Sequence, residues 1–307
     1  MRFLPDVALQ RLQSAADEPD LAGTPYELIE RVGRGGMGAV YRVRDRRLDR
    51  DVALKVLDLV DPDGPGDEEA RLRREARILA GLEHPGIVPV HDVGVLADGR
   101  AFYVMKLVQG ERLDQRAPRM GSLGERLRLF VRLCEPVAFA HRQGVVHRDL
   151  KPENVMIGPF GEVLVMDWGV ARVGRREAAG VVVGTEGYMS PEQARGETDA
   201  VDERSDVFAL GAVLRFLIDQ AASPGSQPAP LRSIAGRACA VDPAARYASV
   251  PELAADVVGF LDRRTVLAHH ESLGERLRRW FRRYETAIVL VLVYLLLRLL
   301  LLLAMQR

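Results

Sequence analysis

A glycine-rich segment near the start of the chain, Gly33-Arg-Gly-Gly-Met-Gly38, has the composition of a phosphate-binding loop. Gly33, Gly35, Gly36 and Gly38 carry no Cβ, so backbone N–H groups there can approach phosphate oxygens closely. A glycine-rich hairpin is as often a plain turn, and a dinucleotide-binding motif needs a helix after the glycines, whereas a strand-like run follows here. The loop alone is therefore weak evidence for nucleotide binding.

Two charged residues further along the chain strengthen this interpretation. Lys55 ends the run Val52-Ala-Leu-Lys55, at the separation from the glycines expected of a lysine that holds α- and β-phosphates. Glu75 lies on the next predicted helix, from which it would pair with Lys55. The alternative is an ordinary surface pair of Lys and Glu, and motifs later in the chain decide against it.

Strands are predicted on both sides of the glycines. Short runs rich in β-branched and aromatic residues predict strands at 26–32, 39–43, 51–57, 87–93 and 101–107. The glycines thus join the first two strands, and Lys55 lies on the third. Residues 1–25 are mixed and polar and include three prolines, which predicts a short arm outside the core.

Two helices are predicted from apolar spacing. One begins at Asp67 and carries Glu75. The other extends from Leu123 to His141 and has the spacing of a long buried helix. Proline removes a helical hydrogen bond, so Pro136 predicts a kink or a locally loosened turn in the second helix.

The composition is that of a globular protein without a bulk charge. Lys+Arg and Asp+Glu number 43 each, so nothing in the net charge directs the chain to nucleic acid. Cys134 and Cys239 lack the paired spacing of a zinc or redox motif, which indicates reduced thiols that serve in packing. The N-terminal sequence does not resemble a secretory signal, so we expect the folded part to stay in the cytoplasm.

Three further motifs follow in order: His147-Arg-Asp-Leu-Lys-Pro-Glu-Asn154, Asp167-Trp-Gly169 and Ser190-Pro-Glu192. With the glycine loop and Lys55, they make residues 26–265 resemble the eukaryotic-like protein kinases, most closely the bacterial serine/threonine kinases. The pair Lys151-Pro152 looks like the Ser/Thr-directed kinases and unlike the tyrosine kinases. The resemblance implies an α+β, bilobal fold with a β-rich small lobe and a helical large lobe. ATP and Mg²⁺, with Mn²⁺ as an option, would occupy the cleft between them.

The resemblance also implies catalytic and metal-binding roles. Asp149 would accept or orient the substrate hydroxyl, and Lys151 would sit beside the transferred phosphoryl group. Lys55 and Glu75 complete the expected catalytic set, and two residues would hold the metal ions, Asn154 and Asp167. Such a set suits phosphoryl transfer, which needs positioned charge more than covalent help.

Further residues would bind the nucleotide beside the four glycines and Lys55. They cover the adenine ring or offer the hinge backbone to its edge: Val40, Ala53, Met105, Lys106, Leu107, Val108 and Met156. Ordinary core packing explains the apolar members equally well, and both readings can hold together. His147 is expected to be a packed structural residue.

The chain departs from the family pattern in the loop after Asp167. Trp168 replaces the usual Phe or Leu, and Ser190 stands where Ala is common. Residues 170–184 contain no Ser, Thr or Tyr, so phosphorylation has no acceptor there. We therefore hypothesise that Glu177 supplies a permanent negative charge to Arg148; the alternative is a solvated Glu beside two arginines.

The large lobe is expected to be shortened. Only residues 221–230 separate the segment that begins at Asp206 from the next predicted helix, where relatives place an extra helix. Arg246 resembles the arginine that pairs with Glu192 in these folds. The resemblance implies loss of a peripheral docking helix and weak or unusual selection of protein substrates.

The last segments predict attachment to a membrane. Residues 266–285 form a basic segment with aromatic residues, and 286–305 are apolar and long enough for a transmembrane helix. Arg298 opposes insertion, but the surrounding Leu, Ile and Val outweigh it, and its side chain is expected to snorkel. With two residues beyond this segment, no external sensor domain is expected.

The leading hypothesis is a Ser/Thr protein kinase in the cytoplasmic membrane, single-pass, with its kinase domain in the cytoplasm. Its expected partners are ATP, protein substrates with Ser or Thr, and membrane lipid, with a homodimer as an option and no nucleic acid. The alternative is a membrane-tethered pseudokinase scaffold that binds nucleotide or partners without transfer. The complete set of charged site residues weighs against that alternative.

Overall fold

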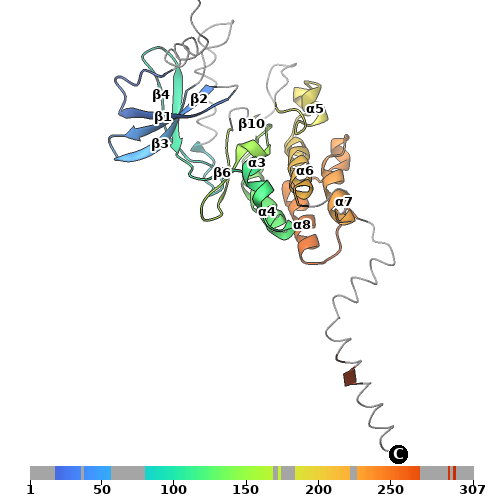
Figure 1. Cartoon of the computed structure of the whole chain (residues 1–307). Helices are drawn as coiled ribbons and strands as arrows, with labels where there is room; N and C mark the ends of the chain where they lie inside the picture. Colours follow the sequence, from blue (N-terminus) through green and yellow to red (C-terminus); the bar gives the residue numbers. More distant parts are fainter. Residues whose placement is uncertain are drawn as a thin grey trace, which may run out of the picture.

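The computed structural model describes residues 18–35, 38–56, 80–168, 172–173, 184–221, 227–269, 290 and 293–294. A β-sheet lobe is followed by a helical lobe (Figure 1), which confirms the predicted α+β arrangement. The predicted helix at residues 67–79, with Glu75, lies outside the described residues. So do Gly36, Glu177, Arg298 and nearly all of residues 270–307.

The small lobe is a five-stranded antiparallel sheet in the order β1-β2-β3-β5-β4. Its strands are β1 (Tyr26–Gly35), β2 (Gly38–Asp45), β3 (Arg50–Val56), β4 (Val90–Val95) and β5 (Ala101–Lys106). Tyr41, Leu54 and Val104 are fully buried in a core on one face of this sheet. Alternation of buried and less buried residues along β2 matches the period of two that positions one face inward.

The five predicted strands all occur in this sheet, some with different ends, whereas the short strands after residue 106 were not predicted. Gly33 and Gly35 lie within β1, because the strand continues to the hairpin and pairs Gly35 with Gly38. Ile87, predicted to start a strand, instead forms an isolated bridge to Val165, and β4 begins at Val90.

Residues 18–25, the described end of the segment predicted as an arm outside the core, pack on the small lobe instead. Leu21 is buried in the same apolar cluster as Tyr26. The Arg100 guanidinium donates a hydrogen bond of 3.1 Å to the Glu18 carbonyl. Leu21, an apolar residue in a mostly polar segment, therefore packs against the sheet, and the composition of the segment did not predict this contact.

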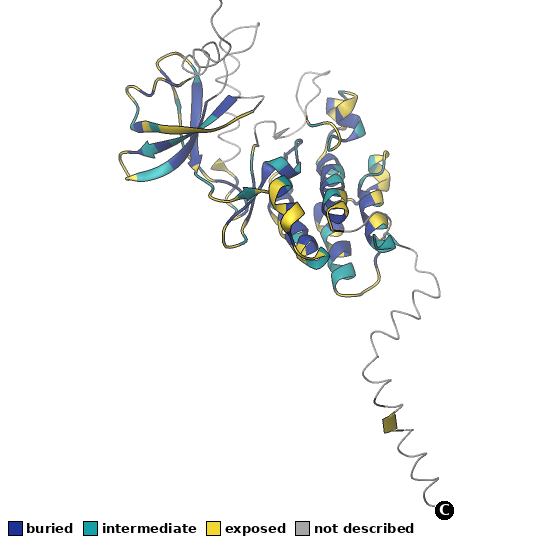
Figure 2. Ribbon diagram, in the orientation of Figure 1, coloured by how far each residue is buried: buried dark blue, intermediate teal, exposed yellow. Residues whose placement is uncertain are grey.

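The large lobe is built from four helices that bury their apolar faces against one another (Figure 2): α4 (Leu123–Arg142), α6 (Glu203–Asp219), α7 (Ala229–Ala238) and α8 (Val250–Leu261). Ser122 caps α4 by accepting the Glu125 N–H, and Asp202 caps α6 by accepting the Arg204 N–H. Shorter helical pieces complete the lobe: α3 (Leu113–Arg116), α5 (Pro191–Ala194), η1 (Ala117–Arg119), η2 (Pro152–Asn154), η3 (Thr198–Ala200) and η4 (Pro243–Ala245).

Small strands lie between the sheet lobe and the helices. One three-stranded sheet has the order β6-β8-β9, with β6 (Glu111–Arg112), β8 (Val155–Ile157) and β9 (Val163–Val165). A two-stranded sheet pairs β7 (Val145–Val146) with β10 (Arg172–Val173). The β7-to-β8 connection holds the motif that begins at His147, so these short strands position it.

Pro136 does not interrupt α4, which continues from Leu123 to Arg142 as one helix. The proline is buried, and a Cβ on Gly86 would lie only 3.0 Å from its Cγ. The Pro136 ring thus packs against Gly86 in the segment that precedes β4. Packing against Gly86 accounts for a proline where helix propensity argues against one.

The folded part extends beyond the predicted boundary at residue 265. The Asp256 carboxylate accepts the N–H groups of Leu267 and Ala268 at 2.8 and 3.0 Å, and Val266 is buried. His269 lies 3.1 Å from the Ser233 hydroxyl on α7. The first residues predicted as a juxtamembrane segment therefore belong to the large lobe.

No helix among the residues that the structure describes has both the length and the apolar character needed to span a membrane. The predicted transmembrane segment, residues 286–305, lies almost wholly outside that part of the chain.

Candidate active site

An apolar surface lies under the small-lobe sheet where the lobes meet. Ala53 of β3 is the cross-strand partner of Met105 of β5, and both are buried in the core that continues into the helical lobe. Val40, Val108 and Met156 are partly buried against that same core. The structure thus brings together the apolar residues predicted to enclose an adenine ring, whereas the Lys106 side chain is exposed.

Gly33, Gly35 and Gly38 lie where β1 and β2 meet, and Gly35 pairs with Gly38. Gly38 has a φ of 137°, a backbone conformation that favours glycine. Val40 of β2 is the cross-strand partner of Lys55 on β3. The hairpin and Lys55 are therefore held on adjacent strands, as the phosphate-binding interpretation requires.

Lys55 and Asp167 form an ion pair that joins the two lobes. The Lys55 Nζ lies 2.6 Å from the Asp167 Oδ1, and only 7% of the lysine side chain is exposed against 41% of the aspartate. Burial would raise the pKa of Asp167, but the nearby charge of Lys55, with smaller effects of His147 and Lys151, holds it below its ordinary value. Asp167 is therefore ionised, with an open side toward solvent.

Asp149 is the centre of a second cluster. Its Oδ1 accepts the Thr185 hydroxyl at 2.8 Å, and its Oδ2 lies 3.0 Å from the Lys151 Nζ. Lys151 also donates to the Thr185 hydroxyl at 2.6 Å. The Asn154 amide nitrogen donates to the Asp149 carbonyl at 2.8 Å and to its Oδ2 at 3.0 Å. The predicted catalytic carboxylate, lysine and asparagine thus converge on one point.

A buried carboxylate that sequence reasoning did not assign to the site holds the backbone of this loop. Asp206 of α6 accepts the N–H groups of His147 and Arg148 at 2.8 and 2.9 Å, and its Oδ2 lies 2.7 Å from the His141 ring. Burial would raise the pKa of Asp206, but these partners hold it below its usual range. Asp206 directly precedes the apolar run Val207–Leu214 of α6, and that placement was the signal that could have identified it.

The backbone of the site has two residues in the left-handed region. Arg148 has a φ of 72° and Asp167 a φ of 57°, a conformation that costs energy for residues other than glycine. The contacts of Asp206 hold the first, and the Lys55 ion pair accompanies the second. Arg148 directly precedes Asp149, and Asp167 itself carries the other carboxylate of the site.

His147 and Trp168 pack together beneath the site. Both are fully buried, their ring centroids lie 4.6 Å apart, and the indole donates to the Val165 carbonyl at 3.2 Å. The imidazole Nε2 lies 3.0 Å from the Met166 carbonyl. His147 is therefore a packed residue, as expected, and the large Trp168 holds the backbone before Asp167 from within.

Ser190 and Glu192 anchor the loop that follows. Ser190 caps α5 together with Gln193, whose amide donates to the Arg148 carbonyl at 2.7 Å. The predicted partner of Glu192 is confirmed: Arg246 binds it through two hydrogen bonds of 2.7 Å, both side chains being buried. Burial opposes ionisation, yet the Arg246 hydrogen bonds lower the pKa of Glu192 to about 2.

Comparison of the sequence with known proteins agrees with this arrangement of residues. The family described as "Protein kinase domain" matches residues 26–230, two thirds of the chain. The chain belongs to the protein kinase family. The chain is similar to bacterial serine/threonine kinases.

Serine/threonine-protein kinase PknB of Mycolicibacterium smegmatis is 41% identical over 76% of this chain and 39% of its own length. Serine/threonine-protein kinase PknD of Chlamydia muridarum is 32% identical over 86% of this chain and 34% of its own length. The kinase described here thus matches about two fifths or less of the length of these curated relatives.

The oxygen atoms of this kinase site fit a divalent cation bound together with a nucleotide. Asp167 offers an ionised carboxylate. The Asn154 amide nitrogen donates its hydrogen bonds to Asp149, so the Asn154 amide oxygen is left as an acceptor. Within the described part of the chain, no group of three or more His, Cys, Asp or Glu could hold a metal by itself. Mg²⁺ is usually bound by one or two protein oxygens plus substrate phosphates, so two donors suffice.

Proposed function

We propose that this chain is an ATP-dependent protein kinase that transfers the γ-phosphate to Ser or Thr hydroxyls of proteins. The observation that supports this most is the cluster of Asp149, Lys151 and Asn154 on the same inter-lobe surface as the Lys55–Asp167 pair. Phosphoryl transfer requires a positioned hydroxyl and compensated phosphate charge, and this arrangement offers both.

Each charged residue has a distinct part in the proposed reaction. Asp149 orients the substrate hydroxyl and accepts its proton, while Lys151 compensates negative charge on the transferred phosphoryl group. Lys55 holds the α- and β-phosphates under the glycine hairpin. Asn154 and Asp167 would hold Mg²⁺, or Mn²⁺ in its place, which supplies charge neutralisation at the phosphates.

The hydroxyl specificity is tested by analysing which amino acid is phosphorylated. We expect phosphoserine and phosphothreonine, and no phosphotyrosine, on an unstructured protein substrate incubated with the full chain and Mg²⁺-ATP. Phosphotyrosine as the main product would contradict the proposal. Tight ATP binding without any transfer would instead support a pseudokinase scaffold.

We further propose that residues 286–305 attach the kinase to the cytoplasmic membrane, with the catalytic lobes in the cytoplasm. The support is the apolar sequence itself, preceded by arginines and aromatics at 275–284. The side chain of Arg298 would snorkel toward the interface. Membrane lipid would then be a partner of the kinase.

A further inference from the structure

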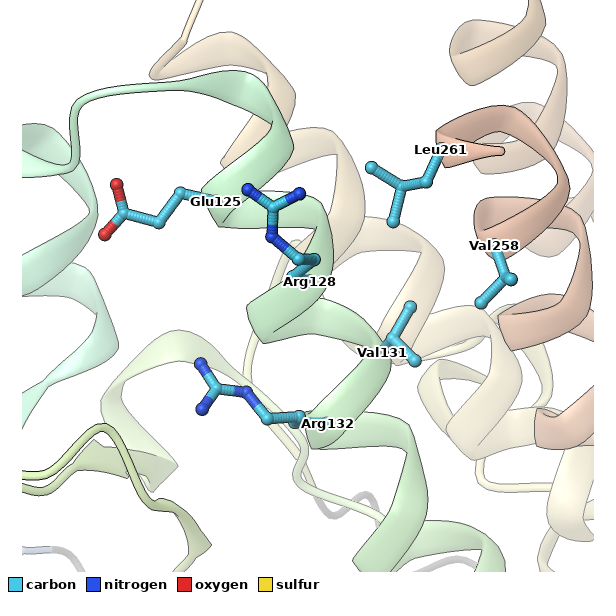
Figure 3. Close-up of a pocket in the computed structure, with 6 residues that line it drawn as sticks. All are labelled: Glu125, Arg128, Val131, Arg132, Val258 and Leu261. Atoms are coloured by element: carbon cyan, nitrogen blue, oxygen red, sulfur yellow. The ribbon is translucent and has the colours of Figure 1, made fainter. Parts of the chain in front are cut away.

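A hollow of about 520 Å³ lies on the large lobe between α4 and α8, and none of the residues that line it belongs to the proposed active site. Figure 3 shows Val258 and Leu261 of α8 facing Val131 of α4 across it. These three aliphatic side chains are only partly buried. The hollow therefore offers apolar surface that a partner could remove from water.

The charges beside the hollow are mainly positive. Arg128 and Arg132 project from the exposed side of α4, against one acid, Glu125. Arg128 forms no ion pair with any residue in the described part of the kinase. A cation without a partner beside an apolar surface favours an occupant that carries both aliphatic and acidic side chains.

A turn next to the hollow extends this surface. The Arg132 guanidinium donates a hydrogen bond of 2.7 Å to the Gly161 carbonyl in the β8–β9 turn. The same turn is tightened by the Glu162 carboxylate, which accepts the Phe160 N–H at 2.9 Å. Phe160 at its tip is 92% exposed. Arg132 thus links the hollow to a large aromatic side chain held out in solvent, which is a feature of contact surfaces.

We infer that the surface formed by the α4–α8 hollow, Arg128 and Phe160 is a docking site for an extended, acidic segment of a protein substrate. This inference rests on the proposed kinase function. Aliphatic side chains of the segment enter between Val131 and Leu261, and a carboxylate of the segment pairs with Arg128. Docking raises the local concentration of the substrate hydroxyl, so it lowers KM without changing the transfer step.

The binding test uses the full chain in detergent with Asp149→Asn, so that no turnover occurs, and dephosphorylated β-casein, an acidic and extended protein, as the probe. We expect Arg128→Glu to weaken casein binding by about fivefold to tenfold and Phe160→Ala by about threefold. The matched control is Arg232→Glu, the same charge reversal on exposed α7, which should leave binding unchanged. Phe160 is solvated, so its replacement leaves folding intact.

The kinetic test compares casein with a short serine peptide cut from it. In the chain with Asp149 intact, Arg128→Glu should raise KM for casein by the same factor, and leave kcat and the peptide KM unchanged. No casein binding by the wild type, equal binding by all variants, or an equal loss with Arg232→Glu would overturn the inference. It would also fall if the variants lost binding to phosphatidylglycerol vesicles and kept casein. Failure to phosphorylate the peptide would contradict the kinase proposal alone, because the binding assay needs no turnover.

Discussion

At the scale of single residues, the site depends on side chains that stay charged although burial disfavours their charged form. Lys55 is almost fully buried and Asp167 keeps a pKa below its ordinary value although burial acts in the other direction. Each charge is tolerated because the other is 2.6 Å away. The pair therefore sets both the position and the ionisation of the carboxylate proposed to hold the metal.

Replacing Lys55 by Met should shift the acid limit of Mg²⁺-ATP binding to higher pH. Burial of Asp167 would then act without the compensating cation, so its pKa rises and its carboxylate is protonated at less acidic pH. Calorimetric titrations of Mg²⁺-ATP at a series of pH values measure this shift, in addition to the loss of affinity. Arg31→Met removes an exposed small-lobe cation and is the control. An unchanged pH profile would refute the role of the ion pair.

The residue types of the site were predictable from the sequence, but the contacts that hold those residues in position were not. The chemistry requires each of the charged or polar site residues, so motif spacing alone identified them: Asp149, Lys151, Asn154 and Asp167. The part of Asp206 depends on α6 approaching the backbone of residues 147–148, which no local spacing encodes. The Lys55–Asp167 contact likewise joins residues 112 positions apart.

At the scale of elements, buried polar contacts fasten the short helices and loops around the site. Arg246 binds the Glu192 carboxylate at the start of α5 and also donates to the Ala240 carbonyl at 2.8 Å. Ser205 of α6 donates to the same carboxylate at 2.8 Å. Glu192 thus fastens the loop after the site to the helices of the large lobe.

Glu192→Gln should lower the free energy of unfolding by about 3 kcal/mol at neutral pH, and by less than half of that at about pH 3. The folded-state pKa of Glu192 is about 2 against an ordinary 4.5, so its contribution is fully present above the ordinary value and lost as pH falls through about 2. Gln imitates the protonated acid. Urea unfolding of both proteins at the two pH values measures the difference, and an equal difference at both would be the contrary result.

Gly110 lies between the predicted hinge and β6, where two backbone segments touch. A Cβ there would overlap the Ile157 carbonyl of β8. Gly110→Ala should therefore destabilise the protein by about 1 to 3 kcal/mol and weaken ATP binding. Thermal unfolding and an ATP titration measure both effects. Gly236→Ala on α7, where a Cβ meets nothing within 4 Å, should be neutral or stabilising; the same loss in both variants would exclude the steric explanation.

The element predictions succeeded where periodicity was strong. The five strands and α4 appear near their predicted places, because alternating or helical spacing of apolar residues specifies the buried face. The ends were less accurate, since the extension of β1 to Gly35 and the core position of Leu21 depend on tertiary contacts. Pro136 was expected to distort α4, and packing against Gly86 shows why it is tolerated.

At the scale of the whole molecule, the kinase fold accounts for residues 18–269 as far as they are described. The lobes meet along a continuous apolar core that carries the proposed adenine surface, so nucleotide binding and lobe association involve the same residues. Membrane attachment is the separate prediction from the apolar sequence of residues 286–305.

The full chain should sediment with membranes and resist extraction by alkaline carbonate. Replacing Leu296 and Leu300 by Asp adds two charges near the centre of the apolar segment, which costs several kcal/mol of insertion. We expect the doubly substituted chain to lose carbonate resistance and keep ATP binding. Equal resistance of both chains would show that residues 286–305 do not anchor the kinase.

The most direct test of the central claim is transfer of radiolabelled γ-phosphate from ATP to a protein substrate by the full chain, with Asp149→Asn beside it. Asn at this position can still pair with Thr185, so the fold and ATP affinity should persist. We predict transfer by the wild type and a loss of about a hundredfold or more in the variant at equal ATP binding. A wild type that binds Mg²⁺-ATP without transfer, or a variant that transfers as fast as the wild type, would contradict the account.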